Sequence, residues 1–275
     1  MKIIDIDALF DKYISNYVYS NIGKVKPEEI ENKIPDLYVK FGDEKLKELD
    51  GKTPNSYYRG FSGEELVKTL ARHVEEGVAV SDFLCEAITA DKKNEDAVCS
   101  AIRQNADEEL IVYLMNMLGQ MQSKKAKDKY LEFILWDYSE GIRELATELL
   151  CDMADEVKET ILLEIDGVSE QKRVNLVEIL SHCQKDDRVL NLLVDEFTSH
   201  PADLQIYAGY LSKFGDERAL PVLMEAIERE KISYADFEEL RFAIEALGGQ
   251  YNKERDFSNE KTYKKIFEKQ KEQKQ

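Results

Sequence analysis

Apolar residues in the middle of the chain recur at two spacings, one within each segment and one between segments. Within a segment they fall three or four residues apart, which is the spacing of a helix face. Between segments one apolar pair returns about every 31 residues, a period typical of helical repeat proteins. The first members of the pairs are Leu118, Leu150, Leu180, Leu211 and Ile244, and the second members, three positions later, are Met121, Met153, Cys183, Phe214 and Leu247. Each pair predicts the end of a helix that comes once per period.

Each period has room for two helices. We expect first helices at about 94–105, 124–137, 155–165, 186–198 and 217–229, and second helices at about 107–120, 139–152, 168–183, 201–214 and 233–248. A helix pair cannot bury its apolar side alone, so neighbouring pairs must stack. The sequence has no Val/Ile/Thr-rich alternating run of strand length. The pattern therefore predicts an all-α fold built from stacked antiparallel helix pairs.

The corner that begins at Gly215 shows how one helix is expected to end and the next to begin. Gly215 tolerates the left-handed conformation that commonly ends a helix. Asp216 follows as an N-cap, where its carboxylate accepts from the unpaired N–H groups of the next helix. Pro221 is expected about five residues inside that helix, where it removes one backbone hydrogen bond and bends the first turn. Pro201 is expected at the first position of the second helix before this corner.

The string Gly215-Asp216-Glu217-Arg218-Ala219-Leu220-Pro221-Val222-Leu223 resembles the first helix of a HEAT repeat of the PBS-lyase type, G-D-x-R-A-x-P-x-L. The preceding helix pair carries Asp186-Asp187-Arg188-Val189-Leu190 at the matching place, without the Gly or the Pro. The resemblance implies an α–α superhelix, a HEAT-like solenoid. It also implies that the second helices line a concave surface, which in such arrays is the usual binding face.

The first 61 residues do not show the repeat, and we expect an irregular helical N-terminal cap there. Asp5 can cap a helix, Pro27 can begin another, and Pro35 is expected to kink or split the latter. Thr53 and Pro54 read as an N-cap followed by a first helical residue. The next segment opens with a predicted capping box, Ser62 with Glu65, and Ser81 is expected to cap a short helix.

This reading divides the chain into a cap at 1–61, a repeat array of about five to six helix pairs at 62–248, and a tail at 249–275. The tail holds eight Lys/Arg and five Asp/Glu, a net charge of +3. It could be an ordinary solvated terminus, fold back on the acidic body, or reach an anionic partner. If it folds back, Tyr263, Ile266 and Phe267 are expected to dock against the last helix pair.

Charge and cysteine usage limit the partners and the compartment. The net charge of −18 argues against nucleic acid and anionic membranes as partners, and it either serves solubility alone or favours basic partners. No apolar stretch approaches the length of a membrane-spanning helix, and no signal peptide is visible. The four cysteines, Cys85, Cys99, Cys151 and Cys183, are scattered through apolar helical patterns, which predicts small buried side chains rather than a metal or disulfide framework. We therefore expect the protein to be located in a reducing cytoplasm.

Residue patterns that carry catalysis are missing from the sequence. Three histidines occur: His73 is expected to face solvent, His200 to be an ordinary polar residue before a helix, and His182 to point away from its neighbour Cys183. There is no HExxH, GxSxG, phosphate-binding loop or metal-ligand spacing. We predict no catalytic residues, no metal ligands and no cofactor.

Two other stretches have structural interpretations. Gly51, Lys52 and Thr53 lack the GxxxxGK[ST] spacing and a preceding strand, so we read them as a turn and not as a phosphate site. The sole tryptophan, Trp136, is expected to pack at a corner between helices.

Polar residues on the second helices form the predicted binding face. On the helix at 168–183, Val174, Val177 and Leu180 are expected to face the core, leaving a ridge of polar residues at helical spacing on the other side. The ridge and its equivalents on the other second helices are Gln171, Asn175, Glu178, His182, Tyr113, Asn116, Glu144, Thr147, Tyr207, Tyr210, Glu238 and Arg241. Tyrosines on such a ridge suit protein recognition. Packing of Tyr207 and Tyr210 between helix pairs is the alternative.

Two functions remain open at this point. The first is a non-enzymatic HEAT-like scaffold that binds a protein or peptide segment, basic in character, on its concave face. The second is an enzyme or small-ligand-binding protein whose site lies where the aromatic-rich N-terminal cap meets the first helix pairs. A deep, aromatic-lined pocket near Tyr57, Tyr58 and Phe61 would favour the second.

Overall fold

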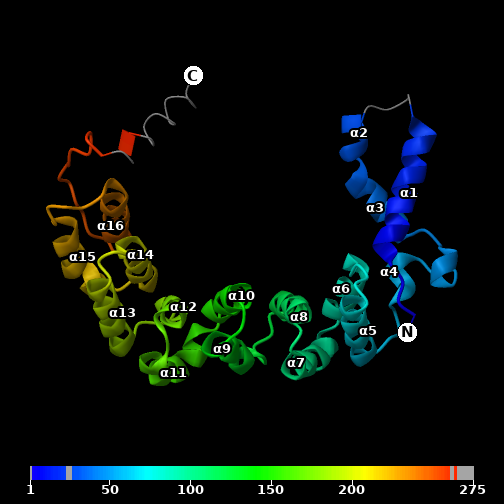
Figure 1. Ribbon diagram of the computed structural model, residues 1–275, viewed down its shortest axis with the longest axis horizontal. Coiled ribbons are helices and arrows are strands. Elements are labelled where there is room, and N and C mark those ends of the chain that lie inside the picture. Colours follow the sequence, from blue (N-terminus) through cyan, green and yellow to red (C-terminus); the bar gives the residue numbers. More distant parts are fainter. Residues whose placement is uncertain (1, 23–26, 261–262, 265–275) are drawn as a thin grey trace. The chain divides into compact units, whose positions relative to one another are not determined.

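A computed structural model of the chain describes residues 2–22, 27–260, 263 and 264. Within these residues the fold is all-helical, with sixteen α-helices and four short 3-10 helices and no strand (Figure 1). The helices fall into two compact units: the N-terminal unit comprises Met1–Lys129 and Ser139–Leu145, and the C-terminal unit comprises Tyr130–Tyr138 and Ala146–Gln275.

All ten helices predicted for the repeat region are present, which confirms the predicted number and order of helices there. The first helices are α7 (Glu95–Gln104), α9 (Lys127–Leu135), α11 (Ala154–Glu164), α13 (Asp187–Ser199) and α15 (Leu220–Ile227). The second helices are α8 (Glu108–Gln120), α10 (Glu140–Cys151), α12 (Glu170–Ser181), α14 (Leu204–Phe214) and α16 (Tyr234–Ala246).

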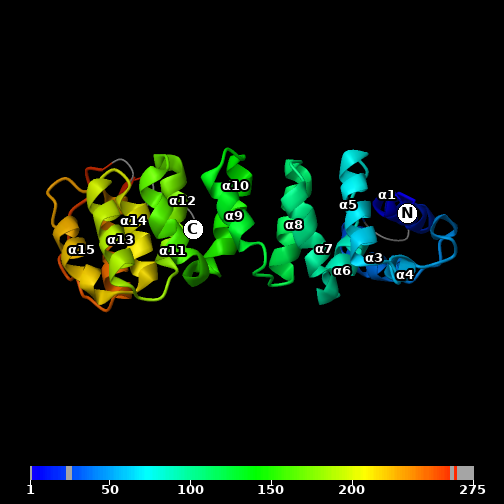
Figure 2. The ribbon, with the colours of Figure 1, turned by 90° about the horizontal axis from the view of Figure 1, so that it is seen from below.

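In the C-terminal unit the helices form two layers. The second helices α12, α14 and α16 pack side by side, and α11, α13 and α15 each pack against the second helix that follows them (Figure 1). Figure 2 shows the helices of this unit running alongside one another. The periodic apolar pairs lie between the layers: Leu180, Leu211 and Ile244 are buried, and so are their partners three residues later. The sequence period is therefore the period of the core.

The corners before α13 and α15 are built in the same way. Asp216 accepts from the backbone N–H of Arg218 at 3.1 Å and from the Arg218 guanidinium at 2.7 Å, and that guanidinium also reaches Asp187 at 2.8 Å. Asp186 and Arg188 make the matching contacts at 2.9 and 2.8 Å, with Glu159 in the place of Asp187. Each arginine thus ties its corner to the first helix of the preceding pair.

These contacts lower the pKa of both corner aspartates. Hydrogen bonds from Arg218 hold the pKa of Asp216 at about 2. Hydrogen bonds from Arg188 push the pKa of Asp186 further below its ordinary range. Gly215 ends α14 with a φ of 73°, as the sequence predicts.

Both proline predictions in this region need correction. The 3-10 helix η4 (Glu217–Ala219) takes the first turn after Asp216, so Pro221 stands at the start of α15 and not five residues inside a helix. There its missing N–H disrupts no helical hydrogen bond. Pro201 lies in a turn ahead of α14, whose N-cap is Asp203.

In the N-terminal unit the cap is helical and irregular: α1 (Ile6–Asn21), α2 (Pro27–Glu31), α3 (Ile34–Gly42), η1 (Lys47–Leu49) and α4 (Pro54–Tyr57) precede α5 (Gly63–Glu75), α6 (Asp82–Thr89) and η2 (Lys92–Asn94). Pro35 splits α2 from α3 by opening the latter. The capping box of Ser62 and Glu65 forms, and so does one between Thr53 and Ser56. Ser81 is the N-cap of α6, although its hydroxyl makes no cap hydrogen bond.

Aromatic rings fill the core of this cap. Phe10 on α1 lies 4.8 Å from Tyr38 and 5.2 Å from Phe41 on α3, measured between ring centroids. Tyr38 stacks at 5.1 Å on Phe83 of α6. The cap is therefore joined to α6 by ring contacts rather than by a repeated aliphatic pair.

The described part of the tail folds back on the C-terminal unit. Tyr263 packs edge-on against Tyr234 at 4.8 Å, and Phe257 lies 5.2 Å from Phe237. Lys253 pairs with Glu228 after α15. The predicted docking of Tyr263 is confirmed, whereas Ile266 and Phe267 lie outside the described residues.

Two other expectations are wrong. Trp136 does not pack at a corner, because 66% of its surface is exposed. His73 does not face solvent: it is buried on α5, with Nδ1 2.8 Å from the carbonyl of Ala79.

Candidate functional site

The predicted binding residues fall into both compact units and differ in exposure. Tyr113, Asn116 and Glu144 belong to the N-terminal unit, and the other nine belong to the C-terminal unit. Exposed members are Asn116, Glu144, Gln171, His182 and Arg241; half-buried members are Tyr113, Asn175, Glu178, Tyr210 and Glu238; Thr147 and Tyr207 are buried. We call the solvent-facing residues of α12, α14 and α16 the second-helix face.

Glu178 and Tyr210 are brought together across α12 and α14. The Tyr210 hydroxyl lies 3.4 Å from Oε2 of Glu178, a distance for a weak hydrogen bond. Burial, and next the charge of Glu178, raise the pKa of Tyr210 above its ordinary value. Cys151 lies close by, since burial followed by the same carboxylate raises the pKa of its thiol to about 12. The cysteine is therefore a thiol at neutral pH and a poor nucleophile.

The remaining predicted residues on this face sit in ordinary polar surroundings. Burial, then the charge of Lys213 on α14, lowers the pKa of His182, which favours its neutral form. Glu238 pairs with Arg241 one turn along α16 at 2.9 Å. Neither arrangement places a nucleophile beside a base.

Tyr207 contributes packing and not exposed area. Its ring stacks on the imidazole of His200 at 4.9 Å, and burial raises the pKa of its hydroxyl to about 12. Of the two readings of this tyrosine, the structure favours packing. Thr147 is likewise buried. Neither side chain offers contact area to a partner in this conformation.

Sequence reasoning missed two apolar residues on the second-helix face. Ile206 on α14 is 45% exposed and Phe242 on α16 is 62% exposed. The signal was present for Phe242, because the buried positions Phe237, Leu240 and Ile244 place it on the opposite side of the helix. Exposed aromatic side chains within polar surroundings are typical anchors for a binding partner.

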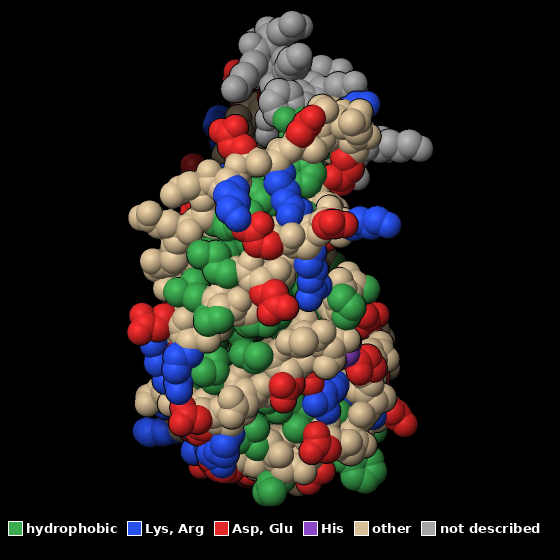
Figure 3. Space-filling view, turned by 90° about the vertical axis from the view of Figure 1, so that its left-hand side faces the viewer, with side chains coloured by type: hydrophobic (Ala, Val, Ile, Leu, Met, Phe, Trp, Pro, Cys, Tyr) green, Lys and Arg blue, Asp and Glu red, His purple; other side chains and the backbone are tan. Residues whose placement is uncertain are grey.

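Acidic residues are concentrated in this part of the chain. Residues 151–250 hold 22 Asp/Glu and 10 Lys/Arg, a net charge of −12, whereas residues 1–150 carry −9. On the face of the C-terminal unit that Figure 3 shows, acidic and basic side chains are interspersed with apolar ones. Ion pairs such as Arg188–Glu159 and Arg218–Asp187 engage basic side chains within the protein. The carboxylates in excess of the basic groups are therefore available to solvent or to a partner.

The N-terminal unit contains a cavity of about 420 Å³ between α4, α5 and α6. Tyr58, Phe61 and Phe83 supply its aromatic lining, and Glu86, Asp91 and Asn94 supply polar groups. Tyr58 is buried, which raises the pKa of its hydroxyl to about 12, and Tyr57 packs against it at 5.0 Å. The volume is within the range of small-molecule sites. Two of the three aromatic residues near which the alternative function expects a pocket, Tyr58 and Phe61, therefore line this cavity.

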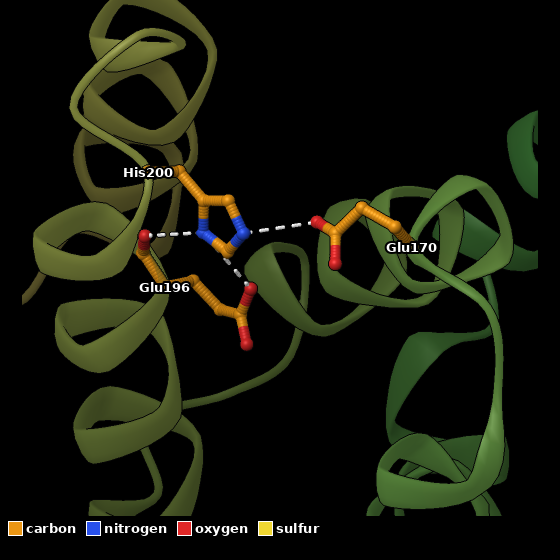
Figure 4. Close-up of side chains that lie close together, drawn as sticks. All are labelled: Glu170, Glu196 and His200. Carbon is orange, nitrogen blue, oxygen red and sulfur yellow. Dashed lines mark hydrogen bonds and ion pairs between the residues drawn. The ribbon is translucent and has the colours of Figure 1, made fainter.

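One group of potential metal ligands was not recognised from the sequence. Glu170, Glu196 and His200 each place a ligand atom within 4.8 Å of the others (Figure 4). The spacing of Glu196 and His200, four residues apart at the end of α13, is visible in the sequence. The third member, Glu170 on α12, comes from the preceding helix pair and is not.

No family model matches the chain, and no curated protein or solved structure matches it. Among the described residues, no helix is both long and apolar enough to cross a membrane.

Proposed function

We propose that the chain is a HEAT-like repeat protein, an α–α superhelix, that binds a protein or peptide segment of basic character on its second-helix face without catalysing a reaction. The observation that carries the proposal is the composition of that face. Glu178, Tyr210 and Glu238 lie on it with exposed Phe242, in the most acidic part of the sequence. Such a face combines aromatic anchors with charges that attract lysine and arginine.

The side chains gathered on the second-helix face suit binding better than covalent catalysis. Within the described residues, the half-buried Cys151 has a raised pKa, and Tyr210 and His182 have their pKa values shifted toward the neutral forms. A nucleophile with a lowered pKa beside a base is the usual mark of covalent catalysis. Binding of a protein or peptide does not require a side chain with a lowered pKa.

The proposal is tested with a random peptide library selected on the full chain. We expect the selected peptides to be rich in Lys and Arg, and their affinity to fall with rising salt. Glu178→Lys, Glu238→Lys and Phe242→Ala should each weaken binding at least about tenfold, or roughly 1.4 kcal/mol. The matched control is Glu225→Lys on α15, which reverses an exposed charge in the other helix layer. Peptides without basic bias, or affinities that ignore the three substitutions, would refute the proposal.

The cavity in the N-terminal unit favours a second function, the binding of a small organic molecule with an aromatic or apolar group. Native mass spectrometry of the purified full chain would detect a bound molecule as added mass. Phe61→Ala removes one half-buried wall of the cavity and should abolish the added mass, whereas Phe242→Ala should leave it unchanged. A chain that carries no added mass and binds no member of a fragment library would exclude this second function.

A further inference from the structure

We infer that Glu170, Glu196 and His200 form a binding site for a divalent transition-metal ion of the Zn²⁺ class. Glu170 is the first residue of α12, Glu196 lies in the last turn of α13, and His200 is the C-cap of α13. Oε1 of Glu170 lies 3.0 Å from Nε2 of His200, and Oε2 of Glu196 lies 3.5 Å from Nδ1 (Figure 4). The three side chains converge from two successive helix pairs.

The imidazole of His200 is held in the orientation that a metal ligand needs. Nδ1 lies 2.8 Å from the backbone carbonyl of Glu196, and a carbonyl oxygen only accepts, so the proton is on Nδ1. In the neutral ring this leaves the lone pair on Nε2, directed toward Glu170. The stacked ring of Tyr207 fixes the plane of the imidazole. Metal-binding histidines usually donate their other ring N–H in this way.

Glu196 supplies the observation that separates a metal site from an ordinary ion pair. Its side chain is only 5% exposed, and its Oε1 accepts from Nε of Arg173 at 2.6 Å. Its Oε2, by contrast, is buried without a hydrogen bond. A protonated His200 would bring its charge to 3.5 Å from this oxygen but would leave it without a hydrogen bond, because Nδ1–H already donates to the carbonyl of Glu196. A buried carboxylate oxygen without a hydrogen bond is costly, and a bound cation would satisfy it.

Distances and charge also fit a small transition-metal ion. Ligand atoms around tetrahedral Zn²⁺ are about 3.4 Å apart, given bond lengths of about 2.0–2.2 Å. One carboxylate oxygen of each glutamate and one ring nitrogen of His200 lie within 4.8 Å of one another, so small side-chain movements would bring them to these distances. Two carboxylates outweigh the single charge of Arg173 and leave the group net negative. One imidazole with two carboxylates suits Zn²⁺, whereas Ca²⁺ prefers six to eight oxygens.

Such an ion would join α12 to α13 and thereby fasten two successive helix pairs. Half-buried His200 and exposed Glu170 leave the ion a path from solvent and a fourth position for water. Because the ligands converge only in the folded chain, binding stabilises the native state in proportion to the logarithm of metal concentration.

The test uses the full chain freed of metal by a chelator and then titrated with Zn²⁺. Wild type is expected to bind one Zn²⁺ by calorimetry, to gain melting temperature with Zn²⁺ but not with Mg²⁺, and to show tetrahedral d–d absorption with Co²⁺. Glu170→Gln and His200→Gln should each lower Zn²⁺ affinity more than about tenfold. His182→Gln is the matched control, because His182 is an exposed histidine of the same unit.

Circular dichroism will show whether each variant is folded; Glu170 is exposed, so its amide variant should fold normally. Loss of affinity in Glu170→Gln and His200→Gln together with retention in His182→Gln establishes the site. The inference is overturned if Zn²⁺ fails to stabilise wild type, if His200→Gln binds as wild type does, or if His182→Gln loses as much affinity. In those cases the three side chains are only neighbours in the fold, joined by the contacts given above.

Discussion

The C-terminal unit repeats a corner made by an aspartate and an arginine, whereas the N-terminal unit has Lys93 in the place of the arginine at its corresponding aspartate, Asp91. Asp186 with Arg188 and Asp216 with Arg218 make the same contacts one period apart. In the N-terminal unit other kinds of cap also begin the helices, such as the capping box of Ser62 at the start of α5. Repeated contacts follow from a repeated sequence, so the C-terminal unit should behave as a chain of similar neighbours.

The cores of the two units also differ in whether their residues repeat along the sequence. Leu180, Leu211 and Ile244 occupy equivalent buried positions in three successive second helices. The cap instead relies on the rings of Phe10 and Phe41, which have no periodic counterpart. An aliphatic pair that recurs gives each helix pair a similar core, while a ring cluster belongs to one place only.

The largest expected effect comes from removing one periodic leucine. Leu180→Ala should destabilise the protein by roughly 3 kcal/mol, because the side chain is fully buried and leaves a cavity. In a stack of neighbours the loss should be greatest near α12. Amide hydrogen exchange should therefore show lost protection in α11–α14 and unchanged protection in α5 and α6.

The matched variant in the N-terminal unit is Leu84→Ala, at an equally buried leucine of α6. It should give the reverse pattern, with lost protection in α5 and α6 and none in α13–α16. If both variants loosen all helices equally, the chain unfolds as one cooperative body and the contrast between the units has no energetic meaning.

What the sequence predicted was local or periodic. Asp216 caps a helix through contacts close to it in the sequence, and Leu180 repeats at a spacing that is typical of stacked helix pairs. The placement of Pro221 failed because a 3-10 turn and an α-helical turn share the same N-cap signal. Helix number and order were therefore predictable, while the first turn of α15 was not.

The candidate sites depend on helix rotation and on contacts between helix pairs, which a sequence pattern leaves open. Rotation decides that Tyr207 is buried while Tyr210 is half-exposed, although both lie on α14. The approach of Glu170 to His200 joins residues thirty positions apart on different helices. Trp136 was wrongly expected to be buried, since size and hydrophobicity indicate burial only on average.

The next largest effect tests the repeated corner. Asp216→Ala removes a buried N-cap and three charge-assisted hydrogen bonds to Arg218, and should cost roughly 2 kcal/mol in urea unfolding. Asp91→Ala removes a cap that accepts only from the backbone N–H of Lys93, and should cost about 1 kcal/mol. Asp195→Ala, at an exposed position on α13, is the control. Equal losses at Asp216 and Asp91 would mean that the arginine contacts add nothing.

The corner also has a predicted pH signature. Because Arg218 lowers the pKa of Asp216 from 3.8 to about 2, the stabilisation is complete above the unfolded value and disappears as pH falls through the folded one. The difference in unfolding free energy between wild type and Asp216→Asn should thus be largest near about pH 7 and shrink between about pH 4 and pH 2. A difference that stays constant over this range would assign the stabilisation to shape rather than charge.

The smallest effect compares the residue that follows each periodic pair. Gln122 occupies this place in the N-terminal unit with a φ of 52°, and Gly215 occupies it in the C-terminal unit with a φ of 73°. A side chain at such a φ costs about 1–2 kcal/mol, while glycine costs about 0.5–1 kcal/mol in unfolded-state entropy. Gln122→Gly should therefore stabilise by up to about 1 kcal/mol, and Gly215→Gln should destabilise by a similar amount.

Gln184 is the matched control for this last comparison. It stands at the same place after Cys183, is exposed like Gln122, and is not among the residues with positive φ. Gln184→Gly relieves no strain and should destabilise by up to about 1 kcal/mol in the same urea titration. Opposite signs for Gln122→Gly and Gln184→Gly would show that one corner position is strained in the N-terminal unit and relaxed in its C-terminal counterpart. If the signs agree, the strain at Gln122 is too small to distinguish the two corners.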